Sequence, residues 1–476
     1  MKKVLYIASE AMPFVSTGGL ADVIGSLPID VAKEGVDVRV VLPLHSRIAD
    51  KYREMMKTEA QFYVQLSWRK QYCGVKSIEW KGVKFYFIDN EYYFSRDTLY
   101  GNYDDGERFA FFSLAAIDML GVIGWYPDVI NANDWQSALS IVYLERKYRE
   151  IEGYENIRTV FSIHNIEYQG KYDLAILGDV FSLNESDRGI VEYNGCINLM
   201  KAAIVCADRV VTVSPRYAGE ICTSEYGSGL ENILVENRYK LMGILNGIDY
   251  EYYDPHHDTE ITRNYTWRSA ARKVENKLAL QRELGLSERA DVPLISIISR
   301  LVSHKGIDLV AEMVYNLLDN NDVQLVVLGC GDYEYEQFFV ELAKHFEGRV
   351  AALIKYDRDT SKRIYSASDI FLMPSKSEPC GLSQMIASRY GAIPVVRETG
   401  GLFDSIKGFW LCGEDICGNG FTFANYSADE LLERTCAAIA LYNDEALRGK
   451  FVSKIMRVDF SWKTSAKKYL TLYETL

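Results

Sequence analysis

Short apolar runs alternate with helix-like stretches along the whole chain, and this alternation is the strongest constraint on its fold. Ten runs are expected to form strands, at residues 4–7, 38–42, 83–88, 129–131, 160–163, 210–213, 294–298, 325–328, 370–373 and 393–396. Strands that alternate with helices form parallel sheets covered by helices on both faces. The pattern therefore predicts an α/β protein with parallel sheets.

The length of the chain predicts two domains. A chain of 476 residues with 48% hydrophobic content exceeds what one core normally supports. Residues 241–258 separate the two series of runs and contain Asn246-Gly247, a turn-forming pair. We therefore expect an N-terminal domain at 1–245 and a second domain at 246–458.

The last segment, residues 459–476, has the pattern of a helix with one apolar face. Trp462, Ala466, Tyr469 and Tyr473 follow helical spacing within it. We expect this helix to cross back to the N-terminal domain.

Charge and composition exclude several classes of partner and site. The chain has 53 basic and 66 acidic side chains, a net charge of -13, which disfavours nucleic acid or an anionic membrane as the main partner. No apolar run is long enough to span a membrane. Nine scattered cysteines without a CxxC pair favour reduced thiols in the cytoplasm and no zinc site. Asp357-Arg358-Asp359 imitates a metal motif, but we expect it to lie in a surface loop.

The sequence Thr-Gly-Gly-Leu occurs twice, at 17–20 and at 399–402, each time between an apolar run and a helix-like stretch. Paired glycines let backbone amides approach an anion, and a following helix adds partial positive charge. Phosphate is the expected ligand of both turns. An ordinary tight turn is the structural alternative.

Two cations follow the expected strand at 294–298. Arg300 and Lys305 lie where its carboxyl end should be. Arginine offers a planar fork and lysine a mobile point charge, so the pair suits a diphosphate. A solvated basic turn is the alternative.

Glu378 follows the expected strand at 370–373. Leu382 and the apolar positions after it have helical spacing, with Pro379 near the expected first turn. At the N-terminus of this expected helix, Glu378 could accept hydrogen bonds from sugar hydroxyls, or it could cap the helix. Cys380 is expected to be a packing thiol, because no histidine is near it in sequence.

His164 and Asp134 follow two strands of the N-terminal series. Each lies at the carboxyl end of its strand, where open parallel sheets bind ligands. A structural histidine and an ordinary loop aspartate are the alternatives.

These motifs, in their order along the chain, resemble glycosyltransferase family 5, the bacterial and plant glycogen and starch synthases. The resemblance runs nearly from end to end. It takes in 9–10, 13–14, 17–23, 105–109, 134–136, 164–165, 168–170, 212–215, 243–249, 300–301, 305–306, 378–382, 399–402 and 459–462. Order and coverage, and no single motif, carry the assignment.

The resemblance implies a GT-B architecture of two facing Rossmann-like domains with an interdomain cleft. It implies transfer of glucose, with retention, from ADP-glucose to the non-reducing end of glycogen or another α-1,4-glucan. No metal or other cofactor is implied.

The resemblance also assigns roles to residues. Catalytic roles are implied for Glu378, His164, Arg300, Lys305 and Asp134, with the two cations on the diphosphate and the other three on the sugar side. Contacts with the nucleotide sugar are implied for Ser16, Thr17, Gly18, Gly19, Arg300, Lys305, Tyr356, Gly381, Leu382, Thr399 and Gly400. Of these, Tyr356 resembles a tyrosine that stacks near the adenine.

The chain departs from the family pattern in three places. Ser16 stands where the family has a lysine that contacts the diphosphate, Asn133 where it often has histidine, and Val36 where it has histidine. Two hypotheses follow: an active glucan synthase, or a glucan-binding or regulatory paralogue with weak or no transferase activity. We favour the active enzyme because His164, Arg300, Lys305 and Glu378 are all present.

Overall fold

The computed structural model describes residues 2–413 and 415–476, which divide into two compact units. Unit 1 comprises Met1–Gly247 and Trp462–Leu476, and unit 2 comprises Ile248–Ser461. The chain therefore leaves unit 1 after Gly247 and returns to it at Trp462.

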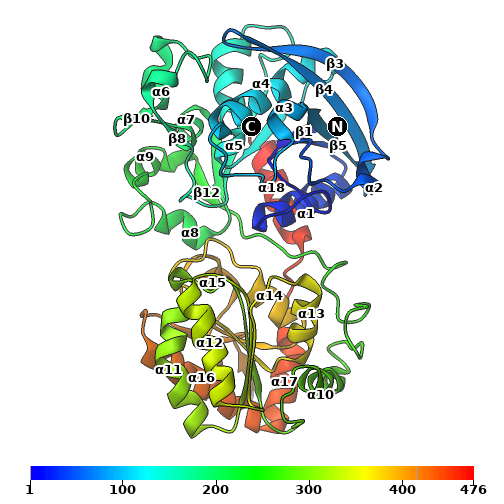
Figure 1. The fold of residues 1–476 in the computed structure, drawn as a ribbon, viewed down its shortest axis with the longest axis vertical. Helices are drawn as coiled ribbons and strands as arrows, with labels where there is room; N and C mark the ends of the chain where they lie inside the picture. Colours follow the sequence, from blue (N-terminus) through cyan, green and yellow to red (C-terminus); the bar gives the residue numbers. More distant parts are fainter. Residues whose placement is uncertain (1, 414) are drawn as a thin grey trace. The chain divides into compact units, whose positions relative to one another are not determined.

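Unit 1 is built on a nine-stranded sheet with the order β12-β11-β7-β6-β1-β2-β5-β4-β3 (Figure 1). Its strands are β1 (Lys3–Ile7), β2 (Asp37–Pro43), β3 (Lys57–Leu66), β4 (Arg69–Trp80), β5 (Val83–Asp89), β6 (Val129–Asn133), β7 (Arg158–Ile163), β11 (Arg209–Thr212) and β12 (Leu241–Gly243). The small strands β8 (Lys171–Tyr172), β9 (Glu192–Tyr193) and β10 (Cys196–Asn198) form a separate sheet. All pairs from β12 to β5 are parallel.

The helices of unit 1 flank this sheet. They are α1 (Gly19–Lys33), α2 (Asp50–Arg53), α3 (Glu91–Phe94), α4 (Asp105–Ile123), α5 (Trp135–Tyr143), α6 (Arg188–Val191), α7 (Leu199–Cys206), α8 (Pro215–Glu220), α9 (Glu231–Glu236) and α18 (Trp462–Glu474). Val4 and Tyr6 of β1 join the apolar cluster under α1 and α18, and Leu5 and Ile7 are fully buried on the opposite face. Burial on both faces explains why β1 reads as a continuous apolar run.

Unit 2 contains a six-stranded, wholly parallel sheet with the order β15-β14-β13-β16-β17-β20. Its strands are β13 (Leu294–Ile298), β14 (Gln324–Leu328), β15 (Val350–Leu353), β16 (Ile370–Met373), β17 (Ile393–Arg397) and β20 (Phe421–Phe423), and β18 (Trp410–Cys412) and β19 (Asp415–Cys417) form a separate hairpin. Its helices are α10 (Lys273–Glu283), α11 (Ile307–Asn320), α12 (Tyr333–His345), α13 (Arg358–Ala367), α14 (Ser383–Arg389), α15 (Gly400–Ser405), α16 (Ala428–Asn443) and α17 (Glu445–Ile455). Alternate residues of β13 join separate apolar clusters on the two faces.

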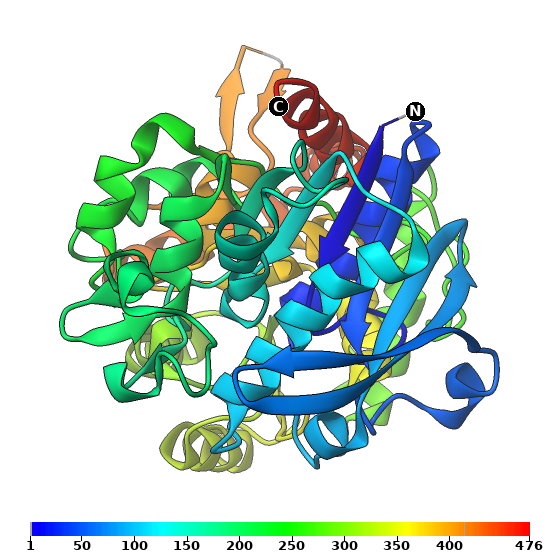
Figure 2. The same cartoon turned by 90° about the horizontal axis from the view of Figure 1, so that it is seen from above.

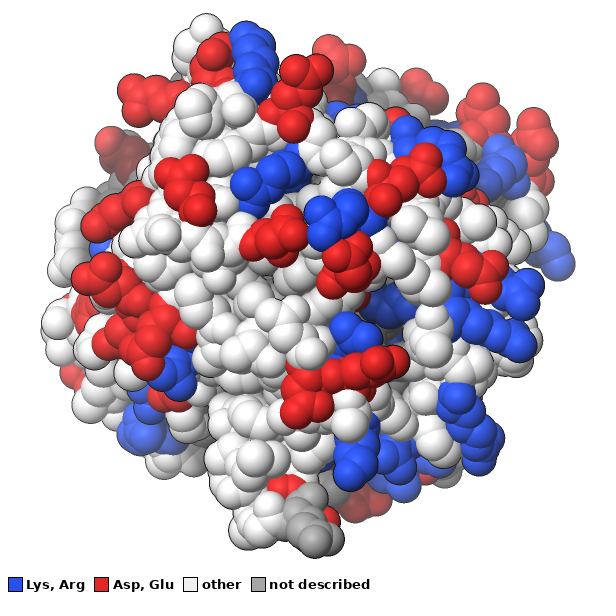
Figure 3. Space-filling model, turned by 90° about the horizontal axis from the view of Figure 1, so that it is seen from below, with Lys and Arg blue, Asp and Glu red and all other residues white. Residues whose placement is uncertain are grey.

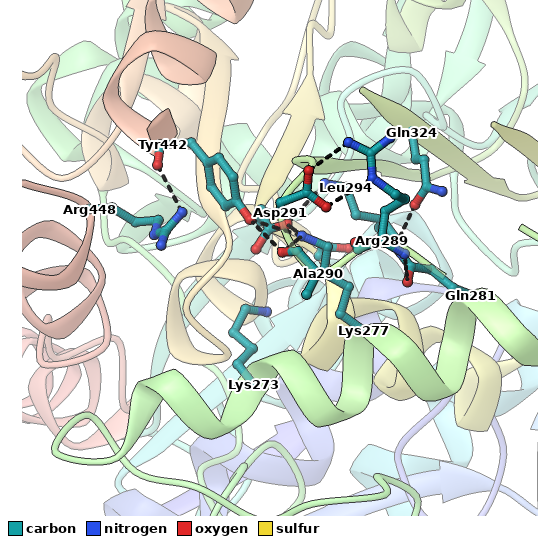
Figure 4. Close-up of polar contacts among 12 residues, drawn as sticks. Lys273, Lys277, Gln281, Arg289, Ala290, Asp291, Leu294, Gln324, Tyr442 and Arg448 are labelled. Carbon is teal, nitrogen blue, oxygen red and sulfur yellow. Dashed lines mark hydrogen bonds and ion pairs between the residues drawn. The ribbon is translucent and has the colours of Figure 1, made fainter. Parts of the chain in front are cut away.

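A buried polar network anchors α10 beside the start of β13 (Figure 4). The Lys277 ammonium lies 2.7 Å from Asp369 Oδ2 and donates to the Tyr442 hydroxyl at 2.9 Å. Asp369 also accepts the backbone N–H of Leu294 at 2.9 Å. Buried charges need such partners. This network lies at the amino end of β13, at the opposite end of the strand from its carboxyl end.

The ten expected strands are confirmed, with ends displaced by no more than two residues. The antiparallel hairpin of β3 and β4 was not expected. Its strands alternate exposed and buried residues, as with Tyr63 and Val64, so they contain no continuous apolar run. A search for apolar runs therefore passes over it.

The surface of the protein carries charges of both signs. Figure 3 shows one face, on which Lys and Arg side chains are interspersed with Asp and Glu. This pattern differs from the continuous basic patch that binds a nucleic-acid backbone. Among residues 2–413 and 415–476, no helix combines the length and apolarity that a membrane crossing requires.

The terminal helix α18 packs against α1 within unit 1, so the last residues of the chain lie beside the first strands (Figures 1 and 2). Trp462 and Tyr473 are buried in the same apolar cluster as Val4 of β1. The Tyr473 hydroxyl donates to Tyr6 at 2.7 Å. The helix is thus part of the core of unit 1.

We expect Trp462→Ala to lower the free energy of unfolding of unit 1 by about 3–5 kcal/mol, because Trp462 is 2% exposed and its loss leaves a cavity. Urea unfolding monitored by circular dichroism measures this change. The exposed Lys467 on the same helix provides the control, since Lys467→Ala should change stability little. Equal stabilities of the two variants would contradict the packing described here.

Candidate active site

The strand order of the unit 2 sheet reverses between β13 and β16. From β13 the chain proceeds outward to β14 and β15, and it then returns to β16 on the other side of β13. β13 and β16 are direct neighbours through Ile295 and Ile370. Loops from the two strands separate at such a point, and the crevice outside their carboxyl ends is where ligands bind in open α/β sheets.

Lys305 and Glu378 meet at this reversal. Lys305 ends a short 3-10 turn after β13, and Glu378 follows β16. The Lys305 ammonium lies 2.6 Å from Glu378 Oε2, and both side chains are largely buried. The Ser375 hydroxyl donates to the same oxygen at 3.0 Å. The sequence predicted each residue at a strand end, and the structure shows that they form an ion pair.

Both contacts of Glu378 use one carboxylate oxygen. Within the residues that the structure describes, Oε1 accepts no hydrogen bond, whereas Oε2 accepts two. Glu378 therefore acts as a paired carboxylate with one oxygen available to a ligand, and its side chain does not cap a helix. The neighbouring helix α14 begins at Ser383, so the prediction that Pro379 lies near its first turn was wrong. Gly381, with φ of 70°, turns the chain between them.

Arg300 lies on the same edge, two residues after β13, and is exposed. Its Nη2 lies 3.0 Å from His304 Nε2, so the guanidinium donates to a neutral imidazole nitrogen. A guanidinium held by a neutral partner keeps its charge for an anionic ligand. Arg300 and Lys305 therefore place two cations beyond one strand.

The turn at 399–401 packs against the backbone that carries Glu378. Gly401 N donates to Glu378 O at 3.0 Å. A Cβ added at Gly400 would lie 1.9 Å from Glu378 O, and one at Gly401 would lie 1.9 Å from Cys380 O. These glycines permit a close approach between two segments of the chain. The buried Cys380 lies in this contact, as expected of a packing thiol.

Tyr356 and the neighbouring acidic motif follow β15, two strands away from β13. Tyr356 is 79% exposed, so its ring is open to a ligand. The prediction that 357–359 form a loop was wrong, because α13 begins at Arg358 and Asp357 is its N-cap. The Asp357 carboxylate accepts from Thr360 N at 3.0 Å and pairs with Lys355 at 2.7 Å. The acid is thus used as a helix cap.

The unit 1 sheet reverses between β1 and β6, and the second group of expected site residues lies there. Asp134 directly follows β6, and its Oδ1 accepts the backbone N–H of His164 at 2.8 Å. Asp134 adopts φ of 54° and ψ of -180°, a conformation costly for a residue with a Cβ. Strained backbone of this kind gathers at functional sites. The structure therefore brings Asp134 and His164 together.

Burial changes the protonation of both side chains. It raises the pKa of the Asp134 carboxyl to about 7 and lowers the pKa of the His164 imidazole to about 4. The His164 ring is therefore neutral at neutral pH. A neutral ring and a partly protonated carboxyl form hydrogen bonds of the kind that sugar hydroxyls make.

Glu10 is a functional candidate that the sequence motifs alone did not single out. It follows β1, and its side chain is buried at 3% exposure. Its Oε2 accepts from Thr17 N at 2.5 Å and from Thr17 Oγ1 at 2.8 Å. Burial raises the pKa of its carboxyl to about 7, although the bonds from Thr17 act in the other direction. The available signal was an acidic residue soon after an apolar strand, within the segment 9–10 of the family resemblance.

The turn at 17–19 differs from its C-terminal counterpart. Thr17, Gly18 and Gly19 are exposed, and Ser16 before them is half-buried. A Cβ added at Gly18 or Gly19 would meet no atom within 4 Å, and neither residue has a positive φ. Packing within the described chain therefore does not require these glycines. Gly18 is the N-cap of α1, whose first backbone amides receive no side-chain cap.

Comparisons with known proteins agree over the whole chain. A family model described as "Starch synthase catalytic domain" matches residues 3–236, and one described as "Glycosyl transferases group 1" matches 285–454. A glycogen synthase of Clostridioides difficile is 46% identical, covering 100% of this chain and 99% of that protein. One of Geobacillus stearothermophilus is 44% identical, covering 100% and 98%.

Solved structures give the same result. The catalytic domain of starch synthase IV from Arabidopsis thaliana, bound to ADP and acarbose, superposes with a TM-score of 0.90 at 34% identity, over 100% of this chain and 99% of that one. Sucrose-phosphate synthase from Thermosynechococcus elongatus has a TM-score of 0.61 at 16% identity, over 100% and 99%, and shares the fold.

The raised pKa of Glu10 makes stability depend on pH. Between about pH 4.5 and 7 the unfolded chain releases this proton while the folded chain retains it, so stability falls as pH rises. We expect the stability of the wild type relative to Glu10→Gln to fall by on the order of 3 kcal/mol across this window. Urea unfolding at pH 4.5 and 7.5 measures it. A pH-independent difference, or the same trend in the exposed-site control Glu474→Gln, would contradict this assignment.

The two glycine turns should respond differently to a methyl group. Gly401→Ala places a Cβ against Cys380 O and should destabilise unit 2 by about 1–3 kcal/mol. Gly19→Ala meets open space at the start of α1 and should leave stability unchanged or slightly higher. Thermal unfolding of the two variants compares them directly. Destabilisation by Gly19→Ala and none by Gly401→Ala would contradict the claim that packing requires Gly401 and does not require Gly19.

Proposed function

The chain belongs to the bacterial and plant glycogen and starch synthases and is a retaining glycosyltransferase of that family with the GT-B fold. On this premise we propose that it transfers glucose from ADP-glucose to the non-reducing end of glycogen or another α-1,4-glucan. The observation that carries the proposal is the Lys305–Glu378 pair at the strand reversal of unit 2, which offers a cation and a carboxylate oxygen to one ligand.

Arg300 and Lys305 bind the donor diphosphate in this proposal. An ammonium group has three N–H donors, and Glu378 uses one of those of Lys305. The other donors are available to phosphate oxygens, so Lys305 can hold phosphate without leaving Glu378. The Arg300 guanidinium adds a planar fork that matches phosphate. Both cations therefore serve the leaving group.

Glu378, His164 and Asp134 act on the sugar side. Glu378 Oε1 accepts a hydroxyl of the transferred glucose, because Oε2 is already occupied by Lys305 and Ser375. His164, fixed through its backbone by Asp134, contributes a neutral ring.

The charge that develops during transfer gives the cations their catalytic effect. As the bond between the glucose C1 and the diphosphate oxygen breaks, negative charge grows on the diphosphate. Preorganised cations and amides that stabilise this charge lower the barrier, and removal of one typically costs on the order of 3 kcal/mol. The new bond forms from C1 to the oxygen of the acceptor hydroxyl, the proton of that hydroxyl passes to the departing diphosphate oxygen, and ADP leaves.

The turn at 17–19 supports the donor without the family lysine. We propose that Ser16, Thr17, Gly18 and Gly19 contact the diphosphate through a hydroxyl and the amides that begin α1, which no side chain of the described residues caps. The open space around both glycines leaves room for phosphate oxygens. This arrangement replaces a cation with hydrogen-bond donors and favours the active enzyme over the regulatory paralogue.

The remaining nucleotide contacts follow the same edge of unit 2. We propose that the exposed ring of Tyr356 stacks near the adenine. Gly381, Leu382, Thr399 and Gly400 lie in the backbone segments around Glu378 and are proposed to contact the donor. The bound ADP and acarbose of the Arabidopsis structure support a nucleotide and an α-glucan as ligands.

We propose a cytoplasmic location for the reaction. Nine cysteines are free thiols in the structure, including the exposed Cys330 and Cys412. Thiols persist in reducing compartments.

The test is incorporation of labelled glucose into glycogen from ADP-glucose and, separately, from UDP-glucose. We expect the wild type to use ADP-glucose and Glu378→Ala to lose about a hundredfold or more in kcat, because the carboxylate and its ion pair disappear. Glu312→Ala, which removes an exposed carboxylate of α11, is the matched control. Ser16→Lys supplies the cation that the family has at this position and should lower KM for ADP-glucose. The wild type, which lacks this cation, should still show measurable turnover.

Two results would contradict the proposal. A wild type inactive with both donors that still binds glycogen would favour the regulatory paralogue. Equal activities of Glu378→Ala and Glu312→Ala would remove Glu378 from the catalytic group.

A further inference from the structure

The side chain of Asn133 has only one possible orientation. Asn133 is the last residue of β6 and is 2% exposed. Its Nδ2 lies 3.1 Å from Ile7 O and 3.0 Å from Asn131 O. Carbonyl oxygens only accept hydrogen bonds, so the amide nitrogen must face them. The amide oxygen therefore points the other way.

This oxygen fixes the proton on the imidazole of His164. Asn133 Oδ1 lies 2.9 Å from His164 Nε2. An amide oxygen can only accept, so Nε2 carries the hydrogen. Burial also lowers the pKa of this imidazole to about 4, and a neutral ring has a single N–H. Nδ1 consequently carries the lone pair.

The lone pair on Nδ1 is available to a ligand. Among residues 2–413 and 415–476, no group is hydrogen-bonded to Nδ1, and the side chain is partly exposed. Asp134 holds the backbone N–H of His164 at 2.8 Å, so the main chain is fixed separately from the ring. The backbone is thus set by Asp134 and the tautomer by Asn133.

We propose that Asn133 is a positioning residue that holds His164 in the Nε2–H tautomer, so that Nδ1 accepts a hydrogen bond from a hydroxyl of the transferred glucose. This inference rests on the proposed function for its ligand. The opposite tautomer would present an N–H at Nδ1, where a sugar hydroxyl could only accept. The amide therefore selects the direction of the hydrogen bond to the sugar.

A purely structural role for Asn133 makes different predictions. A buried amide that only satisfies Ile7 O and Asn131 O would contribute to stability and leave the imidazole unaffected. Asn131 is the matched comparison, because it is a buried amide of the same strand that contacts Tyr473 and Ser162. Its loss should cost stability without reaching His164.

The test is nitrogen NMR of the protein labelled with 15N-histidine, with the His164 signals assigned from His164→Gln. The wild type should show the Nε2–H tautomer. Asn133→Ala should show a mixture of tautomers or the Nδ1–H form, and its kcat with ADP-glucose should fall about 10- to 100-fold, the loss found when the hydrogen-bond partners that orient metal-binding histidines are removed. Asn131→Ala should keep both the tautomer and kcat.

Asn133→His is the second variant and guards against a folding defect in Asn133→Ala. One ring nitrogen can donate to a carbonyl while the other accepts from His164, so this variant should retain the Nε2–H tautomer and most of kcat. An Nδ1–H tautomer in the wild type, or an unchanged tautomer and kcat in Asn133→Ala, would overturn the inference. The NMR measurement needs no substrate and is therefore independent of activity. If the wild type has no transferase activity but the tautomer changes between wild type and Asn133→Ala as expected, only the proposed function is refuted.

Discussion

The reversal of strand order within the main sheet of each unit is the constraint on which the candidate site depends. It separates the loops that follow β13 and β16 in unit 2, and those that follow β1 and β6 in unit 1. Lys305 and Glu378 meet at the first reversal, although 73 residues separate them. Glu10, Asp134 and His164 gather at the second. Sequence neighbours would not assemble these groups, whereas parallel strands bring their carboxyl ends to one edge.

The two edges differ in their electrostatics. Unit 2 offers permanent cations, Arg300 and Lys305, together with a carboxylate that one of them pairs. Unit 1 offers a neutral imidazole and two carboxyls whose pKa values burial raises to about 7. The two Thr-Gly-Gly-Leu turns follow the same division. One is buried and packs against the backbone of Glu378, whereas the other is exposed and its Thr17 amide donates to Glu10.

The sequence was sufficient for features that depend on continuous burial or on position after a strand. All ten apolar runs are strands, and Glu378, Lys305, Asp134 and His164 follow strands as predicted. Features that depend on tertiary contact were not accessible. The Lys305–Glu378 pair forms because β13 and β16 are adjacent strands. The start of α14 at Ser383 depends on packing of the 378–382 segment against the glycine turn. Glu10 lies in the segment 9–10 of the family resemblance but was given no role, because its burial and its bonds from Thr17 are visible only in the structure.

The central claim is that these edges carry out a transfer of glucose with retention. Product analysis of single turnovers tests it most directly, with enzyme in excess over ADP-glucose and maltoheptaose as acceptor. Chromatography measures ADP and glucan length, and proton NMR identifies the new linkage. The account predicts one ADP for each glucan lengthened by a single α-1,4-linked glucose at its non-reducing end. Free glucose released with ADP, or a β-linked product, would contradict it.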